Sequence, residues 1–440
     1  MDADTVVIGA GAAGLAAARS LAGHSMRVIL LEARDRVGGR VWSQPVSRGA
    51  TPAELGAEFI HGPAEETMAL LREAGTVAIT PGGESWTCGE NGDLRRGDDD
   101  AFSSAAGIFE SARSLAEDES VDRFLRRFEG DEAMHKTAET ARAFVEGFDA
   151  ADPTIASVRS IADEFRSGVD STVARPLGSY RPMFERLHDA CRDAGVQTYL
   201  STIVRRISWR RGTVTVDVED AVGKSRTIRA RSAIVTLPVG VLRHSGDVTE
   251  VVFEPSLSTP KGAALRSIEM GHAVKVVLGF RTAFWEQVRE GRYRDAAFFR
   301  CEGRPFPTYW TQLPVRSELI VAWAGGRKAI ALSGVSEAGM IERALDGLGA
   351  LFDERALVRS EFEGGVMHDW SRDPFARGAY SYVAVGGGDA RAVLAMPIDD
   401  TLFFAGEATS GDGQGGTVNG ALETGERAAR EAARSLAAAG

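Results

Sequence analysis

The N-terminal thirty residues alternate between short apolar runs and an alanine-rich stretch, and this pattern predicts a β-α-β unit. Residues 6–8 are continuously apolar, which predicts a buried strand. Residues 12–21 contain many alanines and no proline, so they predict a helix that ends at Gly23. Residues 27–31 then predict a second strand. This order of elements is typical of an α/β nucleotide-binding fold.

Further along the chain, the same reasoning predicts additional strands and helices. Apolar and polar residues alternate over residues 213–218, and an apolar run over 233–237 predicts a buried strand. Strands are also predicted at residues 273–280, 319–324 and 380–385. Helices are predicted over residues 64–74, through much of 101–165, and in the C-terminal segment that begins at residues 416–418.

Three glycines follow the first predicted strand in the spacing of a dinucleotide-binding turn. Gly9 permits the tight turn, Gly11 lets the backbone approach a pyrophosphate, and Gly14 lets the helix pack on the strand. The helix N-terminus offers free N–H groups and a partial positive charge to the phosphates. Glu32 ends the second strand and is placed to bind a ribose with a free 2′-hydroxyl. The predicted pyrophosphate contacts are Gly9, Gly11, Ala12, Ala13 and Gly14.

A second glycine pair follows Glu32. Gly39 is expected to bring more backbone to the pyrophosphate, and Arg40 adds a charged contact. Ala33 and Arg34, which connect Glu32 to this pair, are included among the predicted cofactor contacts. A basic surface loop would explain the arginines but not the glycines between them.

The end of the chain carries a matching set of residues. Gly406 and Glu407 follow an apolar strand, and Gly416, Thr417 and Val418 open the last predicted helix. First and last segments that touch one cofactor enclose it, which points to a buried flavin.

Composition narrows the possible functions. The formal net charge is −11, which disfavours nucleic acid as the main partner. The three cysteines are far apart and show no metal-binding or disulfide spacing, so we expect reduced thiols. No apolar run reaches the ~18 residues of a membrane-spanning helix, and no signal peptide precedes the first strand. The expected location is the cytoplasm, and neither a metal nor a membrane is expected as a partner.

Residues 9–40 resemble the start of the flavin-containing amine oxidase family, which includes monoamine oxidases, polyamine oxidases and flavin-type histone lysine demethylases. By this resemblance Glu32 holds the adenosine ribose, Val204 meets the adenine through its backbone, and Glu407 contacts the ribityl or pyrophosphate region. The segment that runs past the flavin ring contains Gly56, Ala57 and Glu58. From sequence, Glu58 could be a cofactor contact or a loop charge.

The resemblance also implies the catalytic residues. Lys275 matches the strand lysine that holds a water against flavin N5, and a cation there would stabilise charge during reoxidation. Tyr380 matches one wall of an aromatic cage, in a run that starts at Trp370. His61 aligns with a pocket histidine of animal polyamine oxidases and could titrate near neutrality.

Two departures from the family pattern affect the expected chemistry. Thr417 replaces the second tyrosine wall of monoamine oxidases, as in the histone demethylases, and so widens the pocket. Ala379 replaces the cysteine that carries covalent flavin in monoamine oxidases, so the resemblance implies non-covalent FAD.

We therefore expect an α/β protein with a discontinuous Rossmann-type FAD-binding domain and an inserted substrate domain of mixed sheet and helix. The FAD-binding domain would take residues 1–78, 191–245 and 389–440, and the substrate domain 79–190 and 246–388.

The expected reaction is oxidation of an amine to an imine, followed by hydrolysis to aldehyde and amine, with O2 reduced to H2O2. Polyamine-like or N-alkylated amines are favoured. Other amines and amino acids stay open, as does the oligomeric state. The alternatives are a flavin desaturase or isomerase of an apolar substrate, and a flavin-bearing binding protein.

Overall fold

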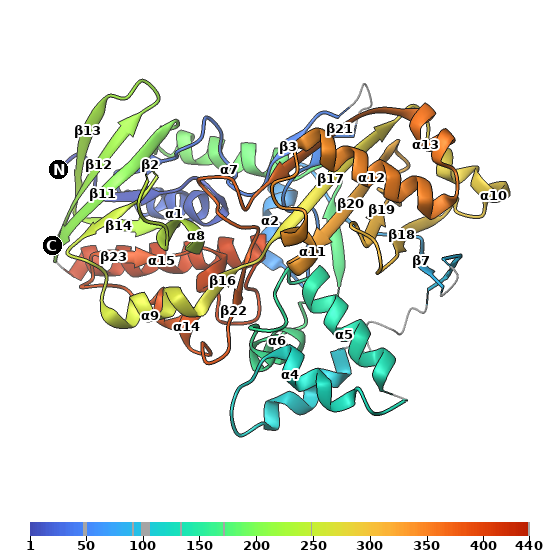
Figure 1. Cartoon of the computed structure of the whole chain (residues 1–440). Coiled ribbons are helices and arrows are strands. Elements are labelled where there is room, and N and C mark those ends of the chain that lie inside the picture. The colour runs from blue at the N-terminus through green and yellow to red at the C-terminus, as the bar shows by residue number, and fades with distance from the viewer. Residues whose placement is uncertain are drawn as a thin grey trace.

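Two sheet-containing regions lie side by side, and a group of helices covers the junction between them (Figure 1). The computed structural model describes residues 1–46, 51–89, 92–97, 106–132, 134–169, 172–247 and 249–438. The two ends of the chain lie close together at the edge of the first region (Figure 1).

The first region is built on a five-stranded sheet that joins strands from both ends of the sequence. Its order is β10-β2-β1-β14-β23, and all its pairs are parallel. The strands are β1 (Thr5–Ile8), β2 (Val28–Leu31), β10 (Gln197–Tyr199), β14 (Ser232–Val235) and β23 (Leu402–Phe404). β1, β2, β14 and β23 are buried throughout, as expected for a parallel sheet covered on both faces.

Two helices from opposite ends of the chain pack against each other on one face of this sheet. α1 (Ala12–Gly23) follows β1, and α15 (Val418–Ala438) is the C-terminal helix. They meet closely at Gly425, where a Cβ would lie 2.2 Å from the carbonyl oxygen of Ala13. The other face is covered by the four-stranded sheet β13-β12-β11-β15. These strands are β11 (Thr202–Arg210), β12 (Thr213–Asp220), β13 (Ser225–Ala230) and β15 (Val252–Glu254).

The second region contains a seven-stranded sheet of order β21-β17-β20-β19-β18-β7-β8. Its pairs are antiparallel except for the parallel pair of β18 and β7. The strands are β7 (Glu84–Cys88), β8 (Leu94–Arg96), β17 (Ala273–Phe280), β18 (Ala296–Arg300), β19 (Thr308–Trp310), β20 (Leu319–Gly325) and β21 (Phe362–Asp369). Helices α12 (Glu337–Phe352) and α13 (Arg355–Glu361) pack over it (Figure 1).

Short elements connect the two regions. The small sheets combine β3 (Ser43–Gln44) with β4 (Ala53–Glu54), β5 (Ile60–His61) and β6 (Ala78–Ile79) with β9 (Val173–Pro176), and β16 (Ile268–Met270) with β22 (Ser381–Val383). Outside residues 101–165, further helices of the described chain are α2 (Glu65–Glu73), α7 (Arg181–Asp193), α9 (Thr259–Ser267), α11 (Gly326–Ala331) and α14 (Ala390–Ala395). One-turn helices in the same parts of the chain are α8 (Val239–Leu242), η3 (Phe284–Glu286), α10 (Val288–Gly291) and η4 (Glu407–Thr409).

The helical prediction for residues 101–165 is confirmed over the described residues, but the helices are short. They are η1 (Glu110–Ser114), α4 (Val121–Leu125), η2 (Arg126–Phe128), α5 (His135–Gly147) and α6 (Val158–Arg166). Residues 101–105 lie outside the described residues. The aromatic residues of this segment, among them Phe109 and Phe124, form a core of their own.

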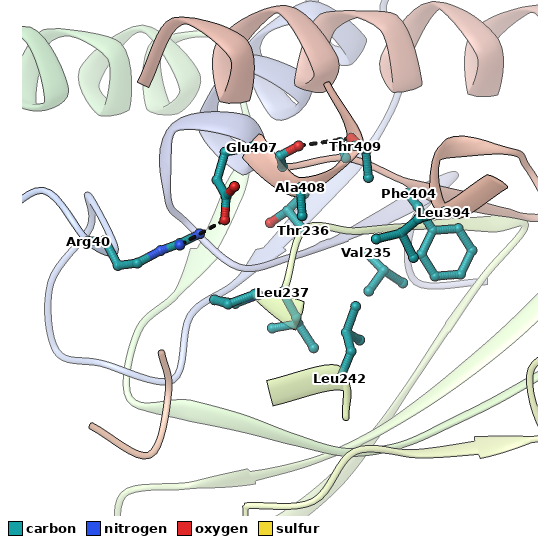
Figure 2. Close-up of a pocket in the computed structure, with 13 residues that line it drawn as sticks. Arg40, Val235, Thr236, Leu237, Leu242, Leu394, Phe404, Glu407, Ala408 and Thr409 are labelled. Carbon is teal, nitrogen blue, oxygen red and sulfur yellow. Dashed lines mark hydrogen bonds and ion pairs between the residues drawn. The ribbon is translucent and has the colours of Figure 1, made fainter. Parts of the chain in front are cut away.

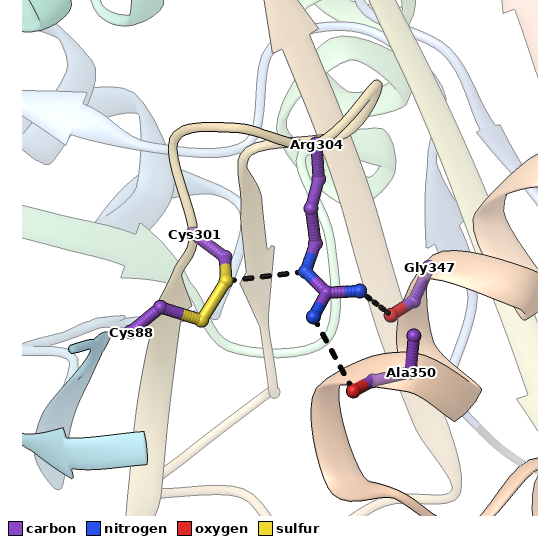
Figure 3. The surroundings of a disulfide bond; sticks show 5 residues. All are labelled: Cys88, Cys301, Arg304, Gly347 and Ala350. Atoms are coloured by element: carbon purple, nitrogen blue, oxygen red, sulfur yellow. Dashed lines mark hydrogen bonds between the residues drawn. A yellow bond between two sulfur atoms is a disulfide. The ribbon is translucent and has the colours of Figure 1, made fainter. Parts of the chain in front are cut away.

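The expectation of three reduced cysteines is wrong. Cys88 and Cys301 form a disulfide with a Cα–Cα distance of 5.0 Å (Figure 3). They are 213 positions apart in sequence, so their spacing gave no sign of the bond. The parallel pairing of β7 with β18 brings them together, because Cys88 ends β7 and Cys301 follows β18. Cys191 is a buried free thiol.

Candidate functional site

The glycine turn between β1 and α1 has the geometry that its sequence predicts. Gly9 has φ +103°, and a Cβ there would lie 2.6 Å from Thr236 Oγ1. A Cβ on Gly14 would lie 1.7 Å from the carbonyl oxygen of Gly9. Gly11 caps α1 and provides no side-chain partner for its first N–H groups. The turn therefore presents backbone donors and a helix N-terminus, which suit a pyrophosphate.

The second glycine pair lies directly against the first turn. Gly39 has φ +58°, and a Cβ there would lie 3.3 Å from Gly11 Cα. Gly38 N donates to the carbonyl of Ala10 at 2.9 Å. Side chains at these positions would fill the space through which a ligand would approach both loops.

Glu32 is buried at the end of β2 and is tied to the same turn. Its carboxylate accepts from Ala10 N at 2.7 Å and from Arg34 N at 2.9 Å. Ala33 lies between these two residues in the chain. The Arg34 guanidinium lies between two carboxylates: Nη1 is 3.8 Å from Glu32 Oε1, and Nη2 donates to Asp373 Oδ1 at 2.6 Å. Backbone bonds from Thr202 to Glu32 and from Ser201 to Arg34 bring β11 and its Val204 beside this loop.

Arg40 and Glu407 join the N-terminal and C-terminal parts of the site. Arg40 Nη1 lies 2.9 Å from Glu407 Oε1 and donates to the carbonyl of Ala379 at 2.8 Å. Glu407 Oε2 accepts from Ser381 Oγ at 2.6 Å and from Gly416 N at 3.1 Å. Burial raises the pKa of Glu407, but Arg40 and Arg391 outweigh burial and hold it below its ordinary value.

These two residues edge a small pocket between the loop after β14 and the loop after β23 (Figure 2). Its lining also includes apolar side chains, among them Leu237, Leu242 and Phe404. The glycine turns, the helix N-terminus and the Arg40–Glu407 pair together fit a dinucleotide with a pyrophosphate and an apolar ring. The predicted Gly406 belongs to this lining and has φ +126°.

Lys275, Trp370 and the segment with Gly56, Ala57 and Glu58 come together in the structure. Lys275 Nζ donates to the carbonyl of Gly56 at 3.2 Å and lies 2.6 Å from Glu58 Oε2. Trp370 Nε1 donates to the carbonyl of Leu55 at 2.9 Å. A Cβ on Gly56 would lie 1.8 Å from the carbonyl oxygen of Arg40, so the segment packs tightly against that loop.

Tyr380 and His61 converge on Phe148, at the end of α5. The buried Tyr380 hydroxyl donates to the carbonyl of Phe148. The His61 ring meets the Phe148 ring at a centroid distance of 4.8 Å. Trp323, the neighbour of Lys275 across the β17–β20 pair, donates to the carbonyl of Gly147 at 2.8 Å. The end of α5 therefore contacts Tyr380 and His61 directly, and it is linked to the strand of Lys275 through Trp323.

His61 does not titrate near neutrality, contrary to expectation. Burial lowers the pKa of His61 to about 4, and its Nδ1 has no partner among the described residues. A neutral imidazole with one unpaired nitrogen can hydrogen-bond a ligand without carrying charge.

The Thr417 hydroxyl bonds backbone groups of neighbouring residues. Thr417 Oγ1 donates to the carbonyl of Gln414 at 2.8 Å and accepts from Gly420 N at 2.9 Å. It therefore caps the start of α15, which begins at Val418. Gly416, just before it, has φ +76°, and a Cβ there would lie 3.4 Å from the Tyr380 ring.

Sequence reasoning missed Asp149. This carboxyl is 6% exposed, its Oδ2 has no hydrogen-bond partner among the described residues, and it follows Phe148 directly. Burial and the neighbouring Glu164 raise the pKa of Asp149 well above its usual range. The only sequence signal was an acid beside an aromatic residue at a helix end, which is common on protein surfaces.

Comparisons with known proteins extend this picture. Residues 12–84 and 91–433 match the family model described as flavin containing amine oxidoreductase. Polyamine oxidase 3 of Oryza sativa subsp. japonica is 28% identical over 464 residues, covering 97% of this chain and 88% of the relative. Lysine-specific histone demethylase 1 homolog 2 of the same organism is 27% identical over 97% of this chain. The chain spans only 56% of that relative's length.

Solved structures share the fold. Wild-type putrescine oxidase bound to putrescine superposes with a TM-score of 0.80 at 20% identity, covering 98% of both chains. Cyclohexylamine oxidase from Brevibacterium oxydans IH-35A gives a TM-score of 0.80 at 23% identity, covering 99% of this chain and 100% of the other. The mixed α/β architecture predicted from sequence is therefore confirmed.

Proposed function

Because the chain belongs to the family of flavin containing amine oxidoreductases, we propose that it is an FAD-dependent amine oxidase. The substrate amine would be oxidised to an imine that hydrolyses to an aldehyde and a smaller amine, with O2 reduced to H2O2. The observation that carries the proposal is that the buried Lys275 and Trp370 bond the segment around Gly56, which packs on the Arg40 loop, while Tyr380 lies against Gly416 near the other end of the chain.

Each side chain has a proposed task. When bound, FAD accepts the hydride equivalent and passes the electrons to O2. Glu32 and Arg40 would hold its ribose and pyrophosphate. Lys275 is a buried cation beside the place proposed for the flavin ring, and the buried Trp370 and the half-buried Tyr380 are proposed as aromatic walls that exclude water.

FAD is proposed to bind without a covalent link. Ala379 offers no thiol, Cys88 and Cys301 are bonded to each other, and Cys191 is buried in the core against α1. Burial raises the pKa of the Cys191 thiol to about 12, so it stays protonated. Acid precipitation should release all the yellow colour into the supernatant, whereas colour in the pellet would contradict this part of the proposal.

The substrate class is proposed to be a polyamine-like or N-alkylated amine. The His61 ring contacts the Phe148 ring, and the buried Asp149, which follows Phe148 in the chain, lies close enough to Tyr380 to raise the pKa of that hydroxyl. The Asp149 carboxyl hydrogen-bonds Glu164, but its Oδ2 has no partner among the described residues, and such a buried oxygen is suited to a second ammonium group of the substrate. Asp149→Asn should therefore lower kcat/KM for a diamine about tenfold more than for a monoamine of the same length. Equal losses for both amines would contradict this assignment.

The activity itself is tested by mixing the purified yellow protein with a panel of amines without oxygen. Bleaching of the flavin by amines, followed by H2O2 formation when air is admitted, is the expected result. Bleaching by apolar alkenes or ketones alone would favour a desaturase or isomerase. Peptides that bind without bleaching would favour a binding protein.

The domain division stays a proposal, with residues 1–78, 191–245 and 389–440 as the FAD-binding part. Its support is that the five-stranded parallel sheet draws its strands from these three segments. β15, at Val252–Glu254, pairs with β11 and would extend the middle segment.

The proposed partners are a small amine and O2. No helix among the described residues is long and apolar enough to span a membrane. A cytoplasmic location was expected partly because the cysteines were expected to be reduced. The disulfide removes this support, since disulfides are rare in the cytosol.

A further inference from the structure

Lys275 is held by a specific carboxylate. Lys275 Nζ lies 2.6 Å from Glu58 Oε2, and both side chains are almost completely buried. Apart from this ion pair, no donor of the described residues reaches Oε2. The lysine is therefore the single partner of that oxygen, and the ammonium has two fixed acceptors, Glu58 and the carbonyl of Gly56.

The other oxygen of Glu58 is anchored from three directions. Oε1 accepts from Trp310 Nε1 at 3.0 Å, from Arg175 Nη1 at 3.2 Å and from Gln312 Nε2 at 3.2 Å. These donors come from β9, from β19 and from the turn after β19. Glu58 lies in an irregular segment, and the three donors fix the position of its carboxylate.

The charges around Glu58 keep it ionised. Burial alone would raise the pKa of Glu58, but Lys275 and Arg175 outweigh burial and hold it below its ordinary value. The cross-strand neighbours of Lys275 are Trp323 and His368, and their polar atoms bond other groups: Trp323 Nε1 donates to the carbonyl of Gly147, and His368 bonds Asp373 at 2.8 Å. Glu58 is thus the one anionic partner that fixes the ammonium among the described residues.

We propose that Glu58 is a positioning residue for Lys275. Donors on β9 and β19 hold the Glu58 carboxylate in place, and the carboxylate in turn holds the Lys275 ammonium. Glu58 thereby fixes the distance between this ammonium and the flavin ring. This inference rests on the proposed function, because it requires flavin beside Lys275. This role differs from the two that the sequence left open for Glu58, a cofactor contact and a loop charge.

The decisive variants are Glu58→Asp and Glu58→Gln, each alone and combined with Lys275→Met. The flavin is photoreduced with EDTA as the electron donor instead of by an amine, so that no substrate is needed, and its reoxidation by O2 is followed by stopped flow. Asp keeps the charge but withdraws the carboxylate by one methylene group. The expected result is a fall in the reoxidation rate on the order of tenfold for both single variants, since a misplacement of about 1 Å has effects of this size or larger.

The second readout is the midpoint potential of the bound flavin. It should become more negative in Glu58→Asp, because the ammonium moves away from the reduced, anionic ring. In a protein that already carries Lys275→Met, a Glu58 substitution should change neither the reoxidation rate nor the midpoint potential further, since Glu58 acts through the lysine. Glu54→Asp is the matched control: this buried carboxyl group lies four residues before Glu58 and bonds Ser43 and Tyr180 instead of Lys275, so the reoxidation rate of this variant should change less than about twofold.

Three results would overturn the proposal. One is a Glu58→Asp rate equal to wild type, and another is a Glu58→Gln rate above wild type, since both would mean that Glu58 acts only by its own charge. The third is an equal effect of Glu58→Asp with and without Lys275. A wild-type protein that binds no flavin would instead refute the proposed function.

Discussion

Replacing Cys88 and Cys301 by serine tests how much their disulfide, which the sequence did not predict, stabilises the folded protein. The disulfide closes a loop of 213 residues. In the chain-entropy model, such a loop corresponds to a loss of about 18 cal/mol/K from the unfolded state, or about 5 kcal/mol at 25 °C. For 440 residues the unfolding entropy is about 0.9 kcal/mol/K, so the double variant should melt about 6 °C lower than wild type.

The assay is thermal unfolding with and without a thiol reductant, followed by circular dichroism and by flavin fluorescence. Reductant should lower the Tm of wild type and leave that of the double serine variant unchanged, because the remaining Cys191 has no partner. Thiol titration of the denatured, unreduced wild type should find one free thiol. Three free thiols, or a wild-type Tm that ignores reductant, would refute the disulfide and the reasoning from loop length.

Loss of the disulfide should change the proposed active site only slightly. Cys301 precedes the turn to β19, which carries Trp310, one of the donors to Glu58. That turn is also held by Arg304, which donates to the carbonyls of Gly347 at 3.5 Å and Ala350 at 3.3 Å on α12 (Figure 3). Flavin content of the double variant should therefore stay near that of wild type.

Three further predictions follow from the site. Burial raises the pKa of Glu54 to about 7, above its ordinary 4.5, so the folded state holds this proton more tightly than the unfolded state. The corresponding stability is complete below about pH 4.5 and is lost as the pH rises through 7, by at most about 3 kcal/mol. In urea unfolding measured across this pH range, the free energy of unfolding of wild type should fall relative to that of Glu54→Gln. Parallel pH dependence of the two proteins would contradict the prediction. Gly14→Ala should abolish flavin binding, because the new Cβ would lie 1.7 Å from the Gly9 carbonyl oxygen, whereas Gly23→Ala meets nothing within 4 Å and should purify yellow. Since the pKa of His61 is lowered to about 4, His61→Asn should leave intact any acid limb of kcat/KM between pH 5 and 8, and its disappearance would assign that limb to His61.

The sequence by itself determined the features that depend on neighbouring residues. The glycine spacing from Gly9 to Gly14 requires a tight turn between a strand and a helix, and the structure has that turn because no side chain fits there. The strand β17 was predicted with the limits that it has, Ala273–Phe280, because a strand buried on both sides is mostly apolar, and Lys275 is the one charged residue in this run. Resemblance to a family then supplied the expected cofactor and the candidate residues.

Only the tertiary structure decided which distant residues share an environment. The Cys88–Cys301 bond depends on the pairing of two strands, and the Glu58–Lys275 pair joins a loop residue to a strand more than 200 positions further along the chain. The state of His61 and of Asp149 depends on how deeply the helices around Phe148 bury them. Burial and partners set charge and reactivity, and both arise from contacts between segments that lie far apart in sequence, so local patterns carry no record of them.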